Sequence, residues 1–399
     1  QTCALPICNV SVDEDAGAQS MSGWATFNPG INESSQGVLA YTVTVTSGAA
    51  FLSAGPSVDT AGTMTFTPAA DANGTVNFDI FVRDTGGTPN GGVDTSATLS
   101  YSITIDPVND APSYTASNPA AVLEDAGAQT TNGWAGGFDP GAANETQSVA
   151  SYNVSNVSNS ALFSAGPSVD ASGNLTFTPA ADAFGTSTFD VTVTDNGGTP
   201  NGGSDTSAPQ TFAITVTPVN DAPTATGSSP TAVLEDAGLQ IITGWAGFSA
   251  GPTNESSQTS LGWTVANVTQ TSGNLTFATA PVVDSAGNLF FEADPDTNGT
   301  ATFELTVQDN GGTANGGTDT SAMAGPFTIT VTPVNDNTPV ADNESFTVAE
   351  GGTATQADLD DGTSLLDGDT DLDLPYDTLT IDTTPVTGPS HGSLTLNAD

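Results

Sequence analysis

Carboxylates are the side chains of this sequence that could do chemistry, and they recur at fixed places along the chain. The 399 residues hold 45 Asp and Glu but a single Lys or Arg, Arg83, for a net charge of −44. Such a chain cannot pair its carboxylates internally, so it must tolerate self-repulsion, sit in high salt or bind cations. Carboxylate and amide oxygens are the ligands that Ca²⁺ prefers. We therefore expect Ca²⁺ as the cofactor, with a generally acidic surface as the alternative.

The same charge balance excludes whole classes of partner and reaction. A single Arg cannot neutralise a nucleic acid backbone or hold the chain on an anionic membrane, and no apolar run approaches the roughly 20 residues of a membrane-spanning helix. Catalysis finds no support either. The one His, His391, stands in a Ser-His-Gly turn, and the absence of Lys excludes Schiff-base chemistry. Paired carboxylates could hydrolyse glycosides, but their recurrence in every repeat favours a structural role, so we expect no enzyme.

Two cysteines, Cys3 and Cys8, stand near the start of the sequence. On a straight strand they would lie roughly 16 Å apart and face opposite sides, whereas a disulfide needs Cα atoms within about 7 Å. They pair only if the segment loops or if the partner is another chain. Two unpaired thiols are the equally open alternative.

The elements that must position the acids form a repeat. Asn-Asp pairs begin at positions 109, 220 and 335, in PVNDAP twice and then PVNDNTP, so the steps are 111 and 115 residues. Gly-Trp, Asn-Glu, the Gly-rich run DNGGTPNGGSDTS and its variants, and the acidic segments VDEDAG and VLEDAG keep the same step. The predicted units are residues 1–108, 109–219 and 220–334, followed by a divergent partial unit at 335–399. Its 65 residues are too few for a full unit, so we expect either a truncated chain or strands supplied from elsewhere.

Each unit reads as all-β. Apolar residues alternate strictly with polar ones in the runs around 41–45, 189–193 and 303–307, and in the last run of each unit, around 101–105, 212–216 and 327–331. Gly, Asn and Pro separate the runs. Short strands at this spacing predict a Greek-key β-sandwich, in which the recurring Trp24, Trp134 and Trp245 are core residues.

PVNDAP is similar to the linker motif between the repeats of cadherins. The first three units resemble bacterial cadherin-like or Ig-like tandem repeats of large surface proteins, and LLDGDTDLDLPYDTLTI with HGSLTLNAD resembles a second subtype. The resemblance implies tandem Greek-key β-sandwich repeats that form an elongated rod on the cell surface or outside the cell. It also implies that calcium sits between successive units.

Carried over residue by residue, the resemblance implies ligands at three junctions. The first junction would use Glu14, Asp71, Asp106, Asn109, Asp110, Asp139, Asn144 and Asp195. The second would use Glu124, Asp182, Asn220, Asp221, Asn254 and Asp309. The third would use Glu235, Asp296, Asn335, Asp336, Asp369, Asp371 and Asp373, the last three on one side of an extended segment.

Two features qualify this assignment. Thr217 and Thr332 replace the leading linker acid Asp106, and Asn28 and Ser249 replace Asp139, so later junctions are expected to bind fewer or weaker ions. The Gly-rich run is a second candidate. Its oxygens at 195, 196, 201 and 205 could form a calcium loop, or the run is a long hairpin turn.

The function that follows is a non-enzymatic, calcium-stiffened stalk for adhesion. One alternative is a subunit of a polymeric fibre, assembled by strand exchange between copies of the chain. A weaker alternative is an array of carbohydrate-binding modules. The expected partners are calcium and either copies of itself or a cell-surface or glycan partner, without nucleic acid or membrane insertion.

Overall fold

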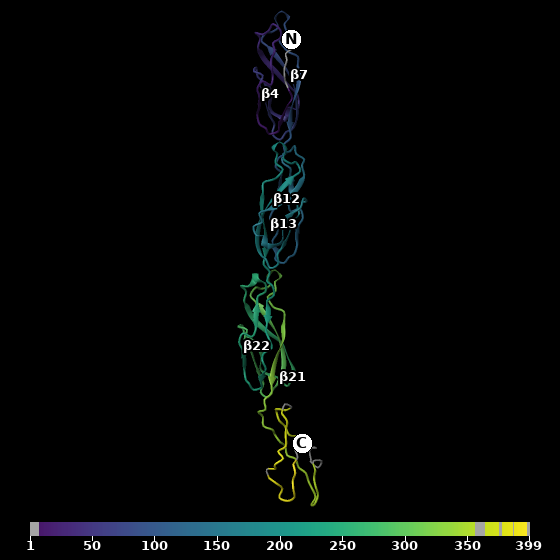
Figure 1. Cartoon of the computed structure of the whole chain (residues 1–399), viewed down its shortest axis with the longest axis vertical. Coiled ribbons are helices and arrows are strands. Elements are labelled where there is room, and N and C mark those ends of the chain that lie inside the picture. Colours follow the sequence, from purple (N-terminus) through teal and green to yellow (C-terminus); the bar gives the residue numbers. More distant parts are fainter. Residues whose placement is uncertain (1–7, 356–363, 375–376, 386, 397–399) are drawn as a thin grey trace. The chain divides into compact units, whose positions relative to one another are not determined.

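The computed structural model describes residues 8–355, 364–374, 377–385 and 387–396. The chain divides into two compact units, Gln1–Pro218 and Val219–Asp399, which are considered separately (Figure 1). The described residues form β-strands joined by turns and by helices of three residues, as predicted. None of the described helices has the length and apolarity needed to cross a membrane.

The first repeat consists of strands β1 to β7. They are β1 (Val10–Asp13), β2 (Gln19–Met21), β3 (Val38–Ser47), β4 (Leu52–Val58), β5 (Met64–Pro68), β6 (Gly74–Asp84) and β7 (Leu99–Asp106). One sheet has the order β1-β7-β6-β3 and the other β2-β5-β4. The chain passes between the sheets at β1–β2, β2–β3, β3–β4 and β5–β6. β1 runs parallel to β7, and the other pairs are antiparallel.

The second repeat follows the same plan with a short added ribbon. Its strands are β8 (Ser113–Thr115), β9 (Val122–Leu123), β10 (Gln129–Thr131), β11 (Gly136–Asp139), β12 (Val149–Ser155), β13 (Phe163–Val169), β14 (Leu175–Pro179), β15 (Gly185–Asp195) and β16 (Gln210–Thr217). The sheets have the orders β12-β15-β16-β9 and β10-β14-β13, and β8 pairs with β11.

The third repeat belongs to the second unit. Its strands are β17 (Thr224–Thr226), β18 (Val233–Leu234), β19 (Gln240–Ile242), β20 (Gly247–Ser249), β21 (Ser260–Gly273), β22 (Phe277–Val283), β23 (Leu289–Ala293), β24 (Gly299–Asp309) and β25 (Ala324–Thr332). The sheets are β18-β25-β24-β21, β19-β23-β22 and the ribbon β17-β20.

Short 3-10 helices occupy the corners of the repeats. They are η1 (Ala49–Phe51), η2 (Pro89–Gly91), η3 (Ser160–Leu162), η4 (Pro200–Gly202), η5 (Thr253–Glu255) and η6 (Ala314–Gly316). Beyond Thr332, the described residues form the isolated bridge between Val340 and Thr370 but no named strand.

In each repeat the two sheets pack around an apolar core. The tryptophans that recur once per repeat contribute to these cores, as predicted. Trp24 and Trp134 are buried. Trp245 is half-buried and packs edge-on against Phe327, with ring centroids 5.1 Å apart. Because these rings contribute to the cores, they offer no exposed platform for stacking a sugar.

Cys3 lies outside the described residues. Cys8 is exposed, and its backbone oxygen accepts a hydrogen bond from the indole N–H of Trp24 at 3.3 Å.

Candidate metal sites

Three carboxylates meet at the end of the first repeat. Asp15 follows β1, Asp71 lies in the turn between β5 and β6, and Asp110 lies in the linker to the second repeat. One oxygen of each lies within 4.8 Å of the others. Asp15 and Asp71 take the left-handed conformation, with φ of 61° and 53°, which Asp tolerates better than most residues. The backbone N–H of Asp71 donates to Oδ1 of Asp15 at 3.2 Å, so the two loops are held together.

The cluster carries negative charge that no side chain of the protein neutralises. Burial raises the pKa of Asp110, and the charges of Asp15 and Asp71 raise it further. The lone Arg83 forms its ion pair with Asp94, at 2.9 Å. A cation that balances the three carboxylates must therefore come from solution.

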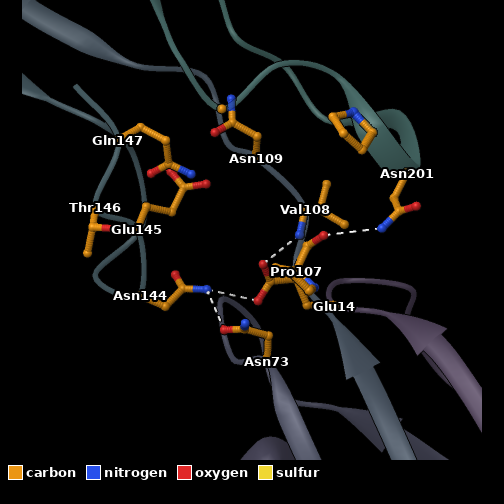
Figure 2. A pocket seen from close by; sticks show the side chains of 12 residues that line it. Glu14, Asn73, Pro107, Val108, Asn109, Asn144, Glu145, Thr146, Gln147 and Asn201 are labelled. Carbon is orange, nitrogen blue, oxygen red and sulfur yellow. Dashed lines mark hydrogen bonds between the residues drawn. The ribbon is translucent and has the colours of Figure 1, made fainter. Parts of the chain in front are cut away.

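Glu14 ties the linker to both repeats (Figure 2). Its Oε1 accepts the backbone N–H of Val108 at 2.8 Å, and its Oε2 accepts the side-chain amide of Asn144 at 2.9 Å. Asn144 also donates to Asn73 at 3.3 Å. Burial raises the pKa of Glu14, and the neighbouring charges of Asp15 and Asp110 raise it, although these hydrogen bonds oppose the rise. Glu14 thus lies beside the cluster, but its oxygens already have partners.

A polar pocket of about 290 Å³ opens beside Glu14, and Figure 2 shows its lining. Asn109 Oδ1, Glu145 Oε2 and Gln147 Oε1 line it, and these buried oxygens have no hydrogen-bond partner among the described residues. The other Glu145 oxygen, Oε1, accepts the backbone N–H of Asp110 at 2.7 Å. Buried acceptors without donors cost free energy unless a cation or water satisfies them. Water in the pocket can satisfy these acceptors, whereas the carboxylate cluster beside it has the donor set of a hard cation such as Ca²⁺.

Asn109 acts as an anchor for the linker. Its amide donates to Asp195 at 3.1 Å and to the backbone oxygen of Ser204 at 2.8 Å, and Ser204 N–H returns a bond to Asn109 O at 2.7 Å. A Cβ on Gly197 would stand 1.8 Å from Asn109 Oδ1, and one on Gly203 would stand 2.8 Å from the Asn109 backbone. The Gly-rich run therefore wraps around the linker Asn.

That arrangement favours the turn interpretation of the Gly-rich run. Asn196 Oδ1 accepts the backbone N–H of Ser148 at 2.9 Å, and Asp205 accepts the Thr206 hydroxyl at 2.9 Å. Asn201 takes a left-handed φ of 55° and donates to the Pro107 carbonyl at 3.3 Å. The side-chain oxygens of Asn196 and Asp205 thus have separate local partners.

Two further predicted ligands of the first junction lie apart from the carboxylate cluster. Asp106 accepts a hydrogen bond from the Ser11 hydroxyl on β1. Asp139 is exposed and accepts the backbone N–H of Gly141 at 3.2 Å. Both carboxylates act locally.

The residues predicted for the second junction are placed within their own units. In the first unit, Asp182 N–H donates to Asp125 at 3.2 Å, repeating the pairing of Asp71 with Asp15, and Glu124 is buried. In the second unit, Asn220 donates to Asp309 at 3.1 Å, and Asp221 N–H donates to Glu255 at 2.9 Å.

Asn254 and Glu255 lie together in η5 of the second unit. Glu255 is buried, and burial raises the pKa of its carboxyl, which the charge of Asp221 raises further. Glu255 therefore occupies the place beside Asp221 that Glu145 occupies beside Asp110.

A second complete carboxylate cluster lies at the other end of the third repeat. Oxygens of Asp236, Asp296 and Asp336 lie within 4.8 Å of one another. Burial raises the pKa of Asp336, and the charges of Asp236 and Asp373 raise it further. Glu235 repeats the role of Glu14, since its Oε1 accepts Val334 N–H at 2.7 Å.

The acidic segment of the fourth unit differs from its prediction. The chain turns at residues 372–374 instead of running extended. The carboxylates of Asp369, Asp371 and Asp373 therefore have different partners. Asp373 accepts the linker N–H groups of Asp336 and Asn337 at 3.1 and 2.9 Å. Asp371 accepts Asp373 N–H at 2.9 Å.

Asp369 joins a third group, in which its oxygen lies within 4.8 Å of those of Asp342 and Glu344. Asn335, the linker Asn of this junction, donates to Asp377 at 2.6 Å. The linker Asn therefore has an Asp partner at all three places where it occurs.

Sequence reasoning missed several acids that the structure brings together. They are Asp15, Asp236, Glu145, Glu255, Asp342 and Glu344. The signal for four of them was in the sequence, because the Glu-Asp-Ala-Gly and Asn-Glu pairs recur at the same step. The resemblance implies only one residue of each pair as a ligand.

Comparisons with known proteins show what parts of the chain are similar to. Residues 109–216 match the family model described as bacterial Ig domain (Big_9), which confirms the predicted resemblance for that stretch. A search of curated proteins gave no match. Mouse cadherin-23 EC22-24 is similar at 14% identity, with 83% of this chain and 97% of that chain covered and a TM-score of 0.42. Mouse protocadherin-24 EC1-3 is similar at 13% identity, with coverages of 83% and 99% and a TM-score of 0.44.

Proposed function

We propose that this chain is a non-enzymatic extracellular array of β-sandwich repeats in which Ca²⁺ bound beside the linkers stiffens a stalk used in adhesion. The observation that carries the proposal is the cluster of Asp15, Asp71 and Asp110, whose oxygens lie within 4.8 Å of one another. It recurs in the second unit as Asp236, Asp296 and Asp336. Recurrence at equivalent places favours a bound ion over an accidental gathering of surface acids.

The donor set supports Ca²⁺ in particular. Ca²⁺ takes six to eight oxygen ligands in flexible geometry, and among the described residues the cluster consists of three carboxylates without a His or Cys. When bound, the ion would supply the positive charge that the sequence lacks. Burial and the charges of Asp15 and Asp71 raise the pKa of Asp110, as expected for a carboxylate that has no cation beside it.

The origin of the three acids supports a stiffening role. Asp15 and Asp71 come from loops of the first repeat, whereas Asp110 belongs to the linker. An ion held by all three would fix the linker to the end of that repeat. Glu14 already joins the linker at Val108 to Asn144 of the second repeat. Holding the linker therefore restricts the next repeat as well.

Calorimetric titration of the full chain with CaCl₂ tests the proposal. We expect saturable binding in wild type, with fewer equivalents bound in Asp15→Ala/Asp71→Ala/Asp110→Ala and full folding of that variant by circular dichroism. An equal count of bound ions in the two proteins would contradict this site, and the absence of binding in both would contradict calcium altogether.

A further inference from the structure

One sheet face of the third repeat carries a row of apolar side chains that point to solvent. Ile241 on β19 pairs with Phe290 on β23, which pairs with Val282 on β22, so the row crosses the whole sheet. Ile241 is 55% exposed, Val282 is 49% exposed, and Phe290 is half-buried. Leu239, two residues before Ile241, is 49% exposed. The neighbouring side chains of β23 point to the other face of the sheet, where Leu289 and Phe291 are fully buried in the core.

The other two repeats show that the fold does not need this row. The equivalent paired positions are Ser20, Thr65 and Ser57 in the first repeat. In the second they are Thr130, Thr176 and Ser168. In both, the outer hydroxyls bond to each other, at 3.0 Å between Ser57 and Thr65 and at 2.9 Å between Ser168 and Thr176.

The inward residues at the same register stay apolar in every repeat, because Met64, Leu175 and Leu289 have 0% exposure. The third repeat therefore has an apolar outer row where the other two have a polar one, while the inward position stays apolar and buried. An exposed apolar row gains nothing for folding, whereas contiguous apolar surface is typical of interaction sites.

Charge at the row restricts what could bind there. Glu292 follows Phe290 on the same face of β23, by strand alternation, where the other repeats have Thr67 and Thr178. Its Oε2 accepts the Thr279 hydroxyl at 3.4 Å. The sequence from Val219 to Asp399 contains no Lys or Arg. The carboxylate of Glu292 thus lies beside the row, and no Lys or Arg of this unit balances its charge. This negative charge favours a cationic partner.

The area of the row argues for a small partner. Four side chains that are about half exposed present a few hundred Å², less than the roughly 800 Å² that each partner of a stable complex buries. A second copy of this chain would also bring its own negative charge against Glu292. An extended or helical segment with apolar and basic side chains meets both conditions.

We propose that the outer face formed by Ile241, Val282, Phe290 and Leu239 binds a cationic amphipathic segment of another protein. Its apolar side chains cover the row, and its Lys or Arg side chains lie against Glu292 and the acidic surroundings. This surface is independent of the metal clusters, since none of its residues belongs to them.

The test uses the full chain and a defined probe. The polar-row variant Ile241→Thr/Val282→Ser/Phe290→Thr gives the third repeat the outer residues of the second. The probe is a fluorescent 18-residue peptide of Leu and Lys in an amphipathic pattern, and the control peptide carries Ser in place of Leu at equal charge. At 0.15 M salt, we expect the Leu/Lys peptide to bind wild type about tenfold or more tightly than the variant, because the row contributes buried apolar area. The Ser/Lys peptide should not distinguish the two proteins.

A reciprocal variant makes the test independent of how the first variant folds. Thr130→Ile/Ser168→Val/Thr176→Phe with Thr178→Glu copies the row into the second repeat and should add a second site for the Leu/Lys peptide. Equal affinity of wild type and polar-row variant, with no site gained in the reciprocal variant, would overturn the proposal. Sedimentation that shows wild type self-associating and the polar-row variant monomeric would overturn it in favour of a second copy.

Discussion

The backbone N–H of Asp71 donates to Oδ1 of Asp15 at 3.2 Å, which joins two loops of the first repeat before the linker arrives. The same bond joins Asp182 to Asp125 at 3.2 Å in the second repeat. All four of these Asp residues have a left-handed φ, between 53° and 61°. The first and second repeats therefore each hold a pair of Asp residues together with their own backbone. In the first repeat, the linker acid Asp110 completes the cluster.

This relationship predicts that Asp15 matters more for calcium than Asp139. We expect Asp15→Ala to weaken calcium binding at least about tenfold, the size of effect that even loss of a residue supporting a ligand produces. Asp139→Ala is the matched control, because Asp139 is an exposed Asp outside the cluster. Calcium titrations of the two variants measure the difference, and a greater loss with Asp139→Ala would restore the ligand set inferred from family resemblance.

The raised pKa of Asp110 predicts a pH-dependent gain from removing its charge. Its ordinary value is 3.8, and the folded protein holds it higher, so the folded state binds the proton more tightly than the unfolded state does. Ionisation therefore costs stability above the folded pKa and costs nothing below 3.8, where both states are protonated. In chelator, Asp110→Asn should melt higher than wild type at pH 7 and equally at about pH 3.

Calcium should reverse that order. With excess CaCl₂ at pH 7, wild type gains a ligand-bound state that Asp110→Asn forms poorly, so wild type should melt higher. Thermal melts of both proteins at the two pH values, with and without the ion, make the comparison. An Asn variant that is less stable in chelator at pH 7 would show that Asp110 is not under repulsion.

Asn109 tests whether the linker amide is an anchor or a ligand. Asn109→Ala removes the bonds to Asp195 and to Ser204 O and leaves a buried carboxylate with fewer donors. We expect a loss of about 1–3 kcal/mol in the free energy of unfolding, equal in calcium and in chelator. A loss confined to calcium-containing buffer would instead identify Asn109 as a metal ligand.

Gly197 of the Gly-rich run should not tolerate a side chain, because the linker Asn packs against it. Gly197→Ala would place a Cβ 1.8 Å from Asn109 Oδ1, whereas Gly166→Ala, a control on β13 outside the run, meets nothing within 4 Å. We expect the first substitution to cost about 1–3 kcal/mol by overpacking and the second to be nearly neutral, as measured by urea unfolding. Equal effects would mean that the run does not clamp the linker.

The strands were predictable from sequence because alternation reports which face is buried. Val191 and Val193 fall on β15, and Ile329 and Val331 fall on β25, all fully buried or nearly so. The identity of the clustered acids was less accessible. Glu14 and Asp15 are adjacent in sequence, and only their different partners in the folded protein distinguish Glu14, which supports the linker, from Asp15, which belongs to the cluster.

The fourth unit shows the same limit. Spacing alone put Asp369, Asp371 and Asp373 on one side, but the turn at residues 372–374 sends them to separate partners. A period-two pattern carries meaning only when the segment is a strand. Leu372 and Leu374 alternate with Asp371 and Asp373, yet both leucines are exposed and the segment turns, so alternation over so short a stretch does not establish a strand. The outer row at Ile241 and Phe290 was missed because it emerges only when three repeats are compared in register.

Thermal unfolding of the full chain in 5 mM CaCl₂ and in excess EDTA, beside Asp15→Ala/Asp71→Ala/Asp110→Ala, tests the calcium-linked account most directly. We predict that calcium raises the melting temperature of wild type by several degrees, because a ligand present at about 100 times its dissociation constant contributes about 2.7 kcal/mol. The triple variant should lose part of that rise. Superimposable melts of wild type in calcium and in EDTA would contradict the account and leave the carboxylates as a solvating surface.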